Sequence, residues 1–138
     1  MKEVTNAVKS LKSNRAPGKD RITAEIIKAS ISKISDILLK LLNVIFQTGI
    51  YPNQWKDGVT IPILKNGDPN DANNYRGITL TSCLGKVLCL ILNKRIETYL
   101  EENNILSKEQ GGFRKYSRTT DQIFVLKRLI DSALKKEK

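Results

Sequence analysis

The sequence has no histidine among its 138 residues, so it offers no imidazole as a general acid, a general base or a metal ligand. Its two cysteines, Cys83 and Cys89, stand six positions apart, which fits no zinc pattern. We interpret them as small apolar residues near a helix. No two aspartates are adjacent, and we interpret the adjacent acids Glu101 and Glu102 as the solvated end of a helix. Chemistry that needs two metal ions held by paired carboxylates is therefore not expected of this chain alone.

Long apolar runs are absent as well, because none approaches the ~18 residues that a transmembrane helix requires. The first residues, Met1 to Glu3, lead into an amphipathic segment, so we expect no signal peptide. A low cysteine content is typical of a reducing compartment. These absences predict an intracellular protein, of the cytoplasm or the nucleus.

Positive charge is what the sequence has in excess. It contains 24 Lys and Arg against 14 Asp and Glu, a net charge of +10. The length suits one domain with a hydrophobic core, and such an excess on one domain predicts a polyanionic partner. Nucleic acid, a nucleotide phosphate and an acidic membrane surface all remain open on charge alone.

Hydrophobic spacing predicts a mostly helical α+β fold. A short helix is expected over residues 3–12, and a longer helical stretch from an N-cap at Thr23 to Thr48, with Gly49 as its C-terminal stop. The serines around Ile31 predict a break in its middle. A turn carrying Trp55 is expected over residues 52–57, and two further helices over residues 82–102 and from about Thr119.

A β-hairpin is predicted between these helical halves. The strand Val59–Leu64 contains Pro62, which indicates an edge, and its partner is expected over residues 75–81. Lys65 ends the first apolar run and Arg76 opens the second. Residues on either side of a hairpin loop approach each other, so these two cations could grip one triphosphate. The alternative is that they are the solvated ends of an ordinary hairpin.

Two further basic segments are candidates for binding. Arg15, Lys19 and Arg21 surround a Pro-Gly turn that is not a P-loop, and a basic turn suits contact with a nucleic-acid backbone; a solvated turn is the alternative. The second segment has two adjacent glycines that permit close approach to a ligand, and aromatic residues interleaved with cations that suit bases and phosphates. A loop with one buried phenylalanine is the alternative there. Its candidate residues are Gln110, Gly111, Phe113 and Arg114.

Taken in order, several segments resemble the fingers of reverse transcriptases, and most closely those of non-LTR (LINE-type) retrotransposons, with group II intron enzymes as more distant relatives. The segments are Ala16-Pro17-Gly18-Lys19-Asp20, Trp55, Ile61-Pro62-Ile63-Leu64-Lys65, Asn74-Tyr75-Arg76-Gly77-Ile78-Thr79-Leu80, Gly85-Lys86, Asn93-Lys94-Arg95-Ile96 and Gln110-Gly111-Gly112-Phe113-Arg114. Each segment is a weak signal alone, but their shared order and spacing make the resemblance strong. Together the segments extend over nearly the whole chain.

The resemblance implies the fingers region of a right-hand polymerase with one antiparallel hairpin, as a partial reverse transcriptase domain over residues 1–138. It implies that Lys65 and Arg76 bind dNTP, and that the segment from Gln110 to Arg114 lies near the template and the nucleotide. The implied partners are an RNA template, a DNA primer, dNTP, and the palm and thumb of a parent polypeptide, with no membrane. Mg²⁺ is expected for the full-length enzyme and no cofactor for this fragment, because the metal-binding aspartates of the family's palm are expected beyond it.

Two departures from the family pattern affect local shape. Lys19 and Arg21 stand where the family often has proline and glycine, and Gly77 where many members have proline. Neither removes a proposed phosphate ligand. Two alternatives to a polymerase fragment stay open: a stand-alone basic nucleic-acid-binding module, and a non-functional remnant of a decayed element.

Overall fold

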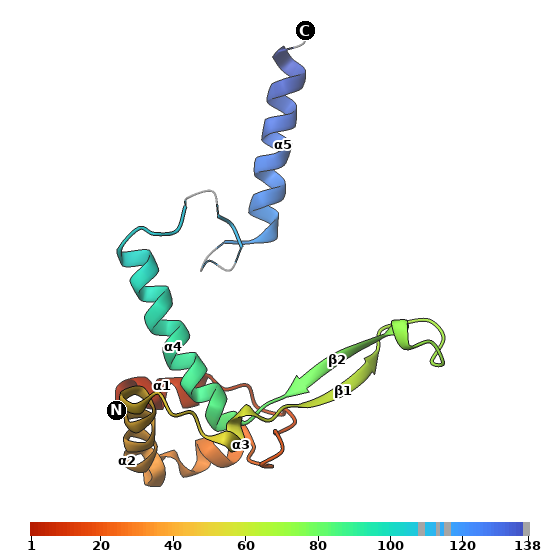
Figure 1. Cartoon of the computed structure of the whole chain (residues 1–138). Coiled ribbons are helices and arrows are strands. Elements are labelled where there is room, and N and C mark those ends of the chain that lie inside the picture. The colour runs from red at the N-terminus through yellow and green to blue at the C-terminus, as the bar shows by residue number, and fades with distance from the viewer. Residues whose placement is uncertain (108–109, 113, 115–116, 137–138) are drawn as a thin grey trace. The chain divides into compact units, whose positions relative to one another are not determined.

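The computed structural model describes all residues except 108–109, 113, 115–116 and 137–138 (Figure 1). The chain divides into two compact units, Met1–Arg95 and Ile96–Lys138. Over the described residues the fold is mostly helical with one two-stranded antiparallel sheet, which confirms the α+β prediction. Its elements are α1 (Lys2–Ser10), α2 (Ala24–Thr48), α3 (Asn53–Lys56), β1 (Val59–Leu64), the 3₁₀ turn η1 (Ala72–Asn74), β2 (Tyr75–Leu80), α4 (Cys83–Glu102) and α5 (Thr119–Lys136).

Helix α2 begins and ends where the sequence predicts. The Thr23 side chain accepts a hydrogen bond from the Ile26 backbone N–H, and Gly49 closes the helix in the left-handed region at φ 70°. The predicted break in the middle is wrong. The Ser30 hydroxyl donates back to the Ile26 carbonyl at 2.7 Å, so the serine is accommodated within a continuous helix of 25 residues.

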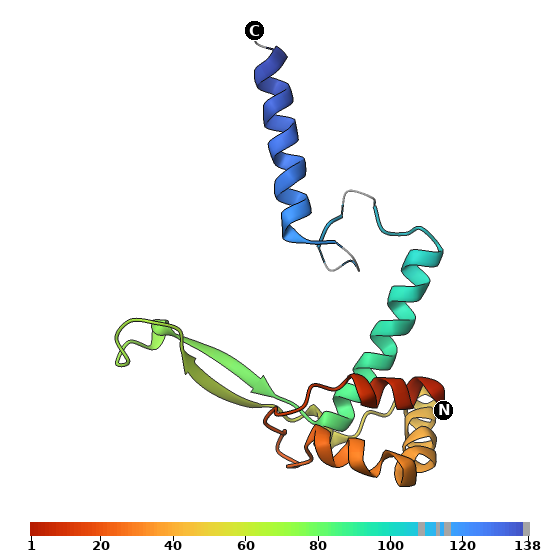
Figure 2. The same cartoon turned by 180° about the vertical axis from the view of Figure 1, so that it is seen from behind.

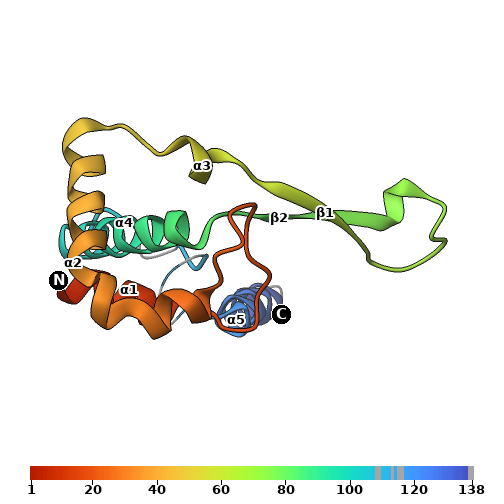
Figure 3. The ribbon, with the colours of Figure 1, turned by 90° about the horizontal axis from the view of Figure 1, so that it is seen from below.

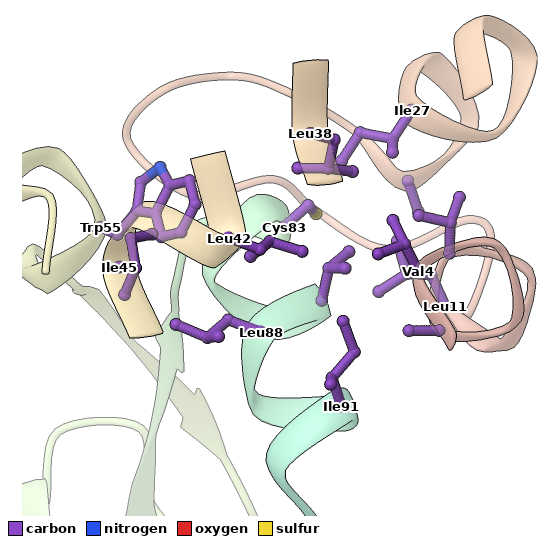
Figure 4. Close-up of a cluster of buried hydrophobic side chains, with 14 residues drawn as sticks. Val4, Leu11, Ile27, Leu38, Leu42, Ile45, Trp55, Cys83, Leu88 and Ile91 are labelled. Atoms are coloured by element: carbon purple, nitrogen blue, oxygen red, sulfur yellow. The ribbon is translucent and has the colours of Figure 1, made fainter. Parts of the chain in front are cut away.

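The core of the first unit lies between α1, α2, α3 and the first half of α4 (Figure 4). Helix α1 buries Val4, Ala7 and Val8 in this core, and Leu11, which follows the helix, is buried with them. Trp55 is buried on α3, which replaces the predicted turn, and its ring packs edge-on against Tyr51 with centroids 5.7 Å apart. The largest fully buried side chains are Ile27, Leu42, Val8 and Val87.

Arg95, on α4, contacts side chains of both α1 and α2 near the surface of this unit. Its guanidinium donates to both carboxylate oxygens of Glu3 on α1, at 2.9 and 2.7 Å. The same group lies 5.0 Å from the ring centroid of Phe46 on α2, within the range of a cation–π contact. Bidentate pairing lowers the pKa of the Glu3 carboxyl.

The hairpin projects from this helical core (Figures 1 and 2). All six residues of β1 are exposed, and the register pairs Ile63 with Arg76 and Pro62 with Gly77. The Lys65 backbone N–H donates to the Asn74 carbonyl at 2.8 Å and extends the ladder by one pair. Because hydrogen-bonded pairs alternate along antiparallel strands, Pro62 falls at a non-hydrogen-bonded pair, where its missing N–H costs no ladder bond.

The second unit contains the end of α4 and helix α5. Helix α4 begins in the first unit at Cys83, next to the predicted start at residue 82, and the Ser82 carbonyl accepts from the Lys86 N–H while its hydroxyl accepts from the Gly85 N–H. In α5 the large apolar side chains are all exposed: Ile123, Phe124, Val125, Leu126, Leu129, Ile130 and Leu134. No helix within the described residues is both long enough and apolar enough to cross a membrane.

Candidate functional site

The hairpin brings Lys65 and Arg76 to one face. Residues directly opposite each other on paired strands point to the same face, so Arg76 shares the face of Ile63. Lys65 lies two positions beyond Ile63, on that same face. Lys65 and Arg76 are therefore diagonal neighbours, a relation in which Cα atoms are roughly 7–8 Å apart. Two long cationic side chains at that spacing can reach one polyphosphate.

Nearby acids do not neutralise these cations. Within the described part of the chain, neither Lys65 nor Arg76 takes part in an ion pair. The loop aspartates are engaged with their own backbone: Asp68 accepts from the Asn70 N–H at 2.9 Å, and Asp71 from the Asn73 N–H at 2.9 Å. The loop thus uses its carboxylates to hold its own shape.

Further bonds fix the hairpin loop. The Tyr75 hydroxyl donates to the Pro69 carbonyl at 2.9 Å, and the Asn74 amide donates to the Asp68 carbonyl at 3.0 Å. Gly67 has φ 85°, a conformation that favours glycine. The two cations are therefore presented on an ordered scaffold, which lowers the entropy lost when a ligand is bound.

The basic turn between α1 and α2 lies at the other end of the hairpin (Figure 3). Lys19 Nζ contacts Asp57, just before β1, at 2.8 Å. A Cβ on Gly18 would come within 2.7 Å of the Thr81 carbonyl carbon, just after β2. Both contacts are at the base of the strands, a strand length or roughly 20 Å from the loop. The structure does not gather the turn and the two hairpin cations into one cluster.

The three cations of this turn that the sequence predicts to contact a nucleic-acid backbone differ in their acidic partners. The hydrogen bond from Lys19 lowers the pKa of the Asp57 carboxyl, and the ammonium is shared with that acid. Arg15 and Arg21 are exposed and form no ion pair with the described residues. Arg21 adopts φ 57°, in the left-handed region. Lys19 thus has a structural role that the sequence did not indicate, whereas Arg15 and Arg21 remain available.

The glycine-containing segment belongs to the second unit. Arg114 donates to both carboxylate oxygens of Glu101, at 3.1 and 2.8 Å, and to the Ser107 carbonyl at 3.0 Å. Glu101 and Glu102 are the exposed end of α4, as predicted, and Glu101 has in addition a partner that the sequence did not indicate, because the hydrogen bond from Arg114 lowers the pKa of its carboxyl. A Cβ at Gly111 would meet only the end of the Gln122 side chain, which is exposed and can move aside, so packing does not require glycine there.

The other predictions for this segment have different outcomes. Gln110 contacts the Gly112 carbonyl at 3.5 Å and has no role assigned by this geometry. Phe113 lies outside the described residues. Among the residues that are described, no group of three or more His, Cys, Asp or Glu side chains could hold a metal ion.

Comparison with known proteins identifies the family. No protein-family model matches the chain. It is 30% identical, over 97% of its length, to the RNA-directed DNA polymerase from mobile element jockey of Drosophila melanogaster. It is 31% identical over 99% of its length to the Pol polyprotein from type-1 retrotransposable element R2 of Popillia japonica, and 31% over 88% to that from element R1 of Bradysia coprophila. The chain belongs to the non-LTR retrotransposon RNA-directed DNA polymerases.

This segment of a retrotransposon polymerase spans only part of its relatives. It covers 14% of the jockey polymerase, 18% of the R2 polyprotein and 12% of the R1 polyprotein. The match therefore confirms the resemblance that the motifs indicated, and it does not favour a stand-alone binding module. The activity of the complete relatives is not carried over to this polymerase segment by the match alone.

Proposed function

We propose that the chain is the fingers portion of an RNA-directed DNA polymerase, and that Lys65 and Arg76 bind the triphosphate of the incoming dNTP. The observation that carries the proposal is the hairpin face on which the two cations are diagonal neighbours without acidic partners among the described residues. The Arg76 guanidinium offers a planar fork for two phosphate oxygens, and the Lys65 ammonium adds a point charge.

The remaining partners follow from the family. An RNA template and a DNA primer are the proposed nucleic-acid partners, and the palm and thumb are proposed for the parent polypeptide. The described residues contain no carboxylate cluster suited to Mg²⁺, so this chain's residues are assigned to binding and positioning only. An intracellular location, in the cytoplasm or nucleus, is likewise proposed from the family.

We call Lys65 and Arg76, as the pair proposed to bind the triphosphate, the clamp. Kinetics in a full-length parent enzyme test it. Replacing Arg76 by Ala removes a charge-assisted contact of about 1.5–3 kcal/mol, so kcat/KM for dNTP should fall roughly tenfold to hundredfold. Arg76→Lys should not restore it, because a point charge cannot make two parallel hydrogen bonds. Affinity for template–primer should change little in either variant.

The matched control is Lys40→Ala, which removes one charge from an exposed position on α2. It should leave kcat/KM for dNTP unchanged. Wild-type efficiency in Arg76→Ala would contradict the clamp and favour solvated hairpin ends.

A further inference from the structure

The hairpin loop, residues 65–74, contains four asparagines, and hydrogen bonds restrain the side chains of three of them. The Asn70 amide donates to the Asp68 carboxylate at 3.0 Å, and the Asn73 amide donates to the Asp71 carboxylate at 3.0 Å. The Asn74 amide donates to the Asp68 carbonyl at 3.0 Å. None of these three amides can turn toward the main chain without breaking a hydrogen bond.

The backbone N–H that follows each of these three asparagines is engaged as well. The Asp71 N–H donates to the Asp68 carbonyl at 3.2 Å, and the Asn74 N–H donates to the Asp71 carbonyl at 3.1 Å. The Tyr75 N–H donates to the Ala72 carbonyl. Each of these nitrogens is therefore turned away from the side chain that precedes it.

Asn66 differs from the other three in both respects. Its side chain is exposed, and neither its amide nor the Gly67 N–H forms a hydrogen bond within the described part of the chain. Asn66 is also the only asparagine of the sequence that a glycine follows. An unrestrained amide thus lies next to a backbone nitrogen that no side chain shields.

The shape of the loop accounts for the glycine at this position. Gly67 has φ 85°, a conformation that other residues rarely adopt. A Cβ there would lie 2.7 Å from the amide nitrogen of Asn74, which the Asp68 carbonyl holds in place. The turn that presents the clamp therefore also places glycine directly after Asn66.

We infer that Asn66 is a site of spontaneous deamidation, and that the carboxylate it forms weakens triphosphate binding by the clamp. The Gly67 nitrogen attacks Asn66 Cγ, so that a new N–Cγ bond forms and the amide nitrogen leaves as ammonia with the proton from Gly67. Water then opens the cyclic imide. Opening at Cγ gives aspartate, and opening at the backbone carbonyl carbon gives isoaspartate. One water is consumed, one ammonia is released, and a neutral amide becomes a carboxylate.

The new charge arises beside Lys65. Consecutive Cα atoms are about 3.8 Å apart, so the carboxylate can pair with the Lys65 ammonium in place of a phosphate. It also repels the triphosphate itself. This consequence rests on the proposed function, whereas the deamidation does not.

Peptide mass spectrometry of the 138-residue chain, incubated at mildly alkaline pH, tests the deamidation. Asn66 should convert several-fold faster than Asn70, Asn73 or Asn74. Asn66→Gln should abolish the fast conversion, because glutamine must close a larger ring. The preference for Asn66 should narrow in denaturing urea, where the other three lose their hydrogen bonds.

Two results would overturn this chemical site. Conversion of Asn66 no faster than that of the other three would show that it is not labile. An equal preference in the folded and the urea-unfolded chain would show that the loop's hydrogen bonds do not select it. An isoaspartate-specific methyltransferase identifies the second product independently of the mass measurement.

Kinetics in a full-length parent enzyme test the consequence. Asn66→Asp carries the charge of the product, so kcat/KM for dNTP should fall about fivefold at low salt. The fall should be smaller at high salt, because exposed charges are screened. The matched control is Asn43→Asp, which adds the same charge at an exposed position on α2 and should keep wild-type efficiency.

Comparison with Arg76→Ala separates the two possible failures. Wild-type efficiency in Asn66→Asp beside a loss in Arg76→Ala would overturn the effect of deamidation and leave the clamp intact. Wild-type efficiency in both variants would count against the clamp itself. Equal losses in Asn66→Asp and Asn43→Asp would also overturn the effect, because the position of the charge would then not matter.

Discussion

At the scale of single residues, the cations fall into two groups: those that form an ion pair with a carboxylate and those that do not. Lys19, Arg95 and Arg114 each form an ion pair with a carboxylate 38, 92 and 13 residues away, and they connect segments of the fold. Lys65 and Arg76 form no ion pair with a described residue. Arg15 and Arg21 form none with the described residues either, so cations without an acidic partner occur in several segments of the chain. Exposed ion pairs such as those of Lys19, Arg95 and Arg114 contribute little to the free energy of unfolding, so we assign them the role of positioning the segments that they connect.

The Lys19–Asp57 pair predicts a measurable pKa. Because the hydrogen bond from Lys19 lowers the pKa of Asp57 in the folded chain, the pair's stabilising contribution is present above the unfolded value and is lost as pH falls through the folded value. In Lys19→Gln the Asp57 carboxyl should titrate at a higher pH than in the wild type. Carbon-detected NMR of the carboxyl measures both midpoints. Identical midpoints in the two proteins would show that the pair does not form in solution.

At the scale of elements, the hairpin explains where proline is allowed. Pro62 and Gly77 face each other at a non-hydrogen-bonded pair, so neither backbone nitrogen is needed by the ladder. Gly77→Pro should therefore keep the hairpin, although its Cβ must displace the Thr60 methyl group, which would lie 2.9 Å away. Ile78→Pro, one residue further, removes a ladder donor and should disrupt the hairpin.

Cross-strand nuclear Overhauser effects between β1 and β2 measure this difference. They should persist in Gly77→Pro and disappear in Ile78→Pro. Loss of these signals in both variants, or their retention in both, would show that the register is not the one described.

Local signals predicted most of these elements, and tertiary contacts decided the rest. The caps of α2 were predictable because threonine and glycine act within a few residues, and β1 was predictable because its apolar run ends at Lys65. The continuity of α2 was not, since a serine either breaks a helix or bonds back to it, and the sequence does not say which. The Arg114–Glu101 pair could not be predicted either, because nothing in the sequence specifies a partner across an irregular loop.

At the scale of the whole molecule, exposed apolar side chains are numerous. They occupy one stripe of α2, through Ile37, Leu41 and Val44, and much of α5. Apolar surface of this extent is typical of faces that are covered in a larger assembly. We therefore expect the isolated 138-residue chain to bind a hydrophobic dye and to self-associate at micromolar concentration.

Dye fluorescence and light scattering over a concentration series measure this behaviour. Replacing Ile37 and Val44 together by Lys should reduce both signals without unfolding the chain, since both side chains are more than half exposed. A sharply melting wild-type monomer that binds no dye would contradict the expectation.

The central claim is that Lys65 and Arg76 hold one triphosphate together, and a double-mutant cycle in a full-length parent tests it most directly. Steady-state kcat/KM for dNTP is measured for the wild type, Lys65→Ala, Arg76→Ala and the double variant. If both side chains bind the same ligand, their effects should be non-additive, with a coupling free energy of about 0.5–3 kcal/mol. Effects that add within about 0.3–0.5 kcal/mol, or no effect of either substitution, would contradict the shared clamp.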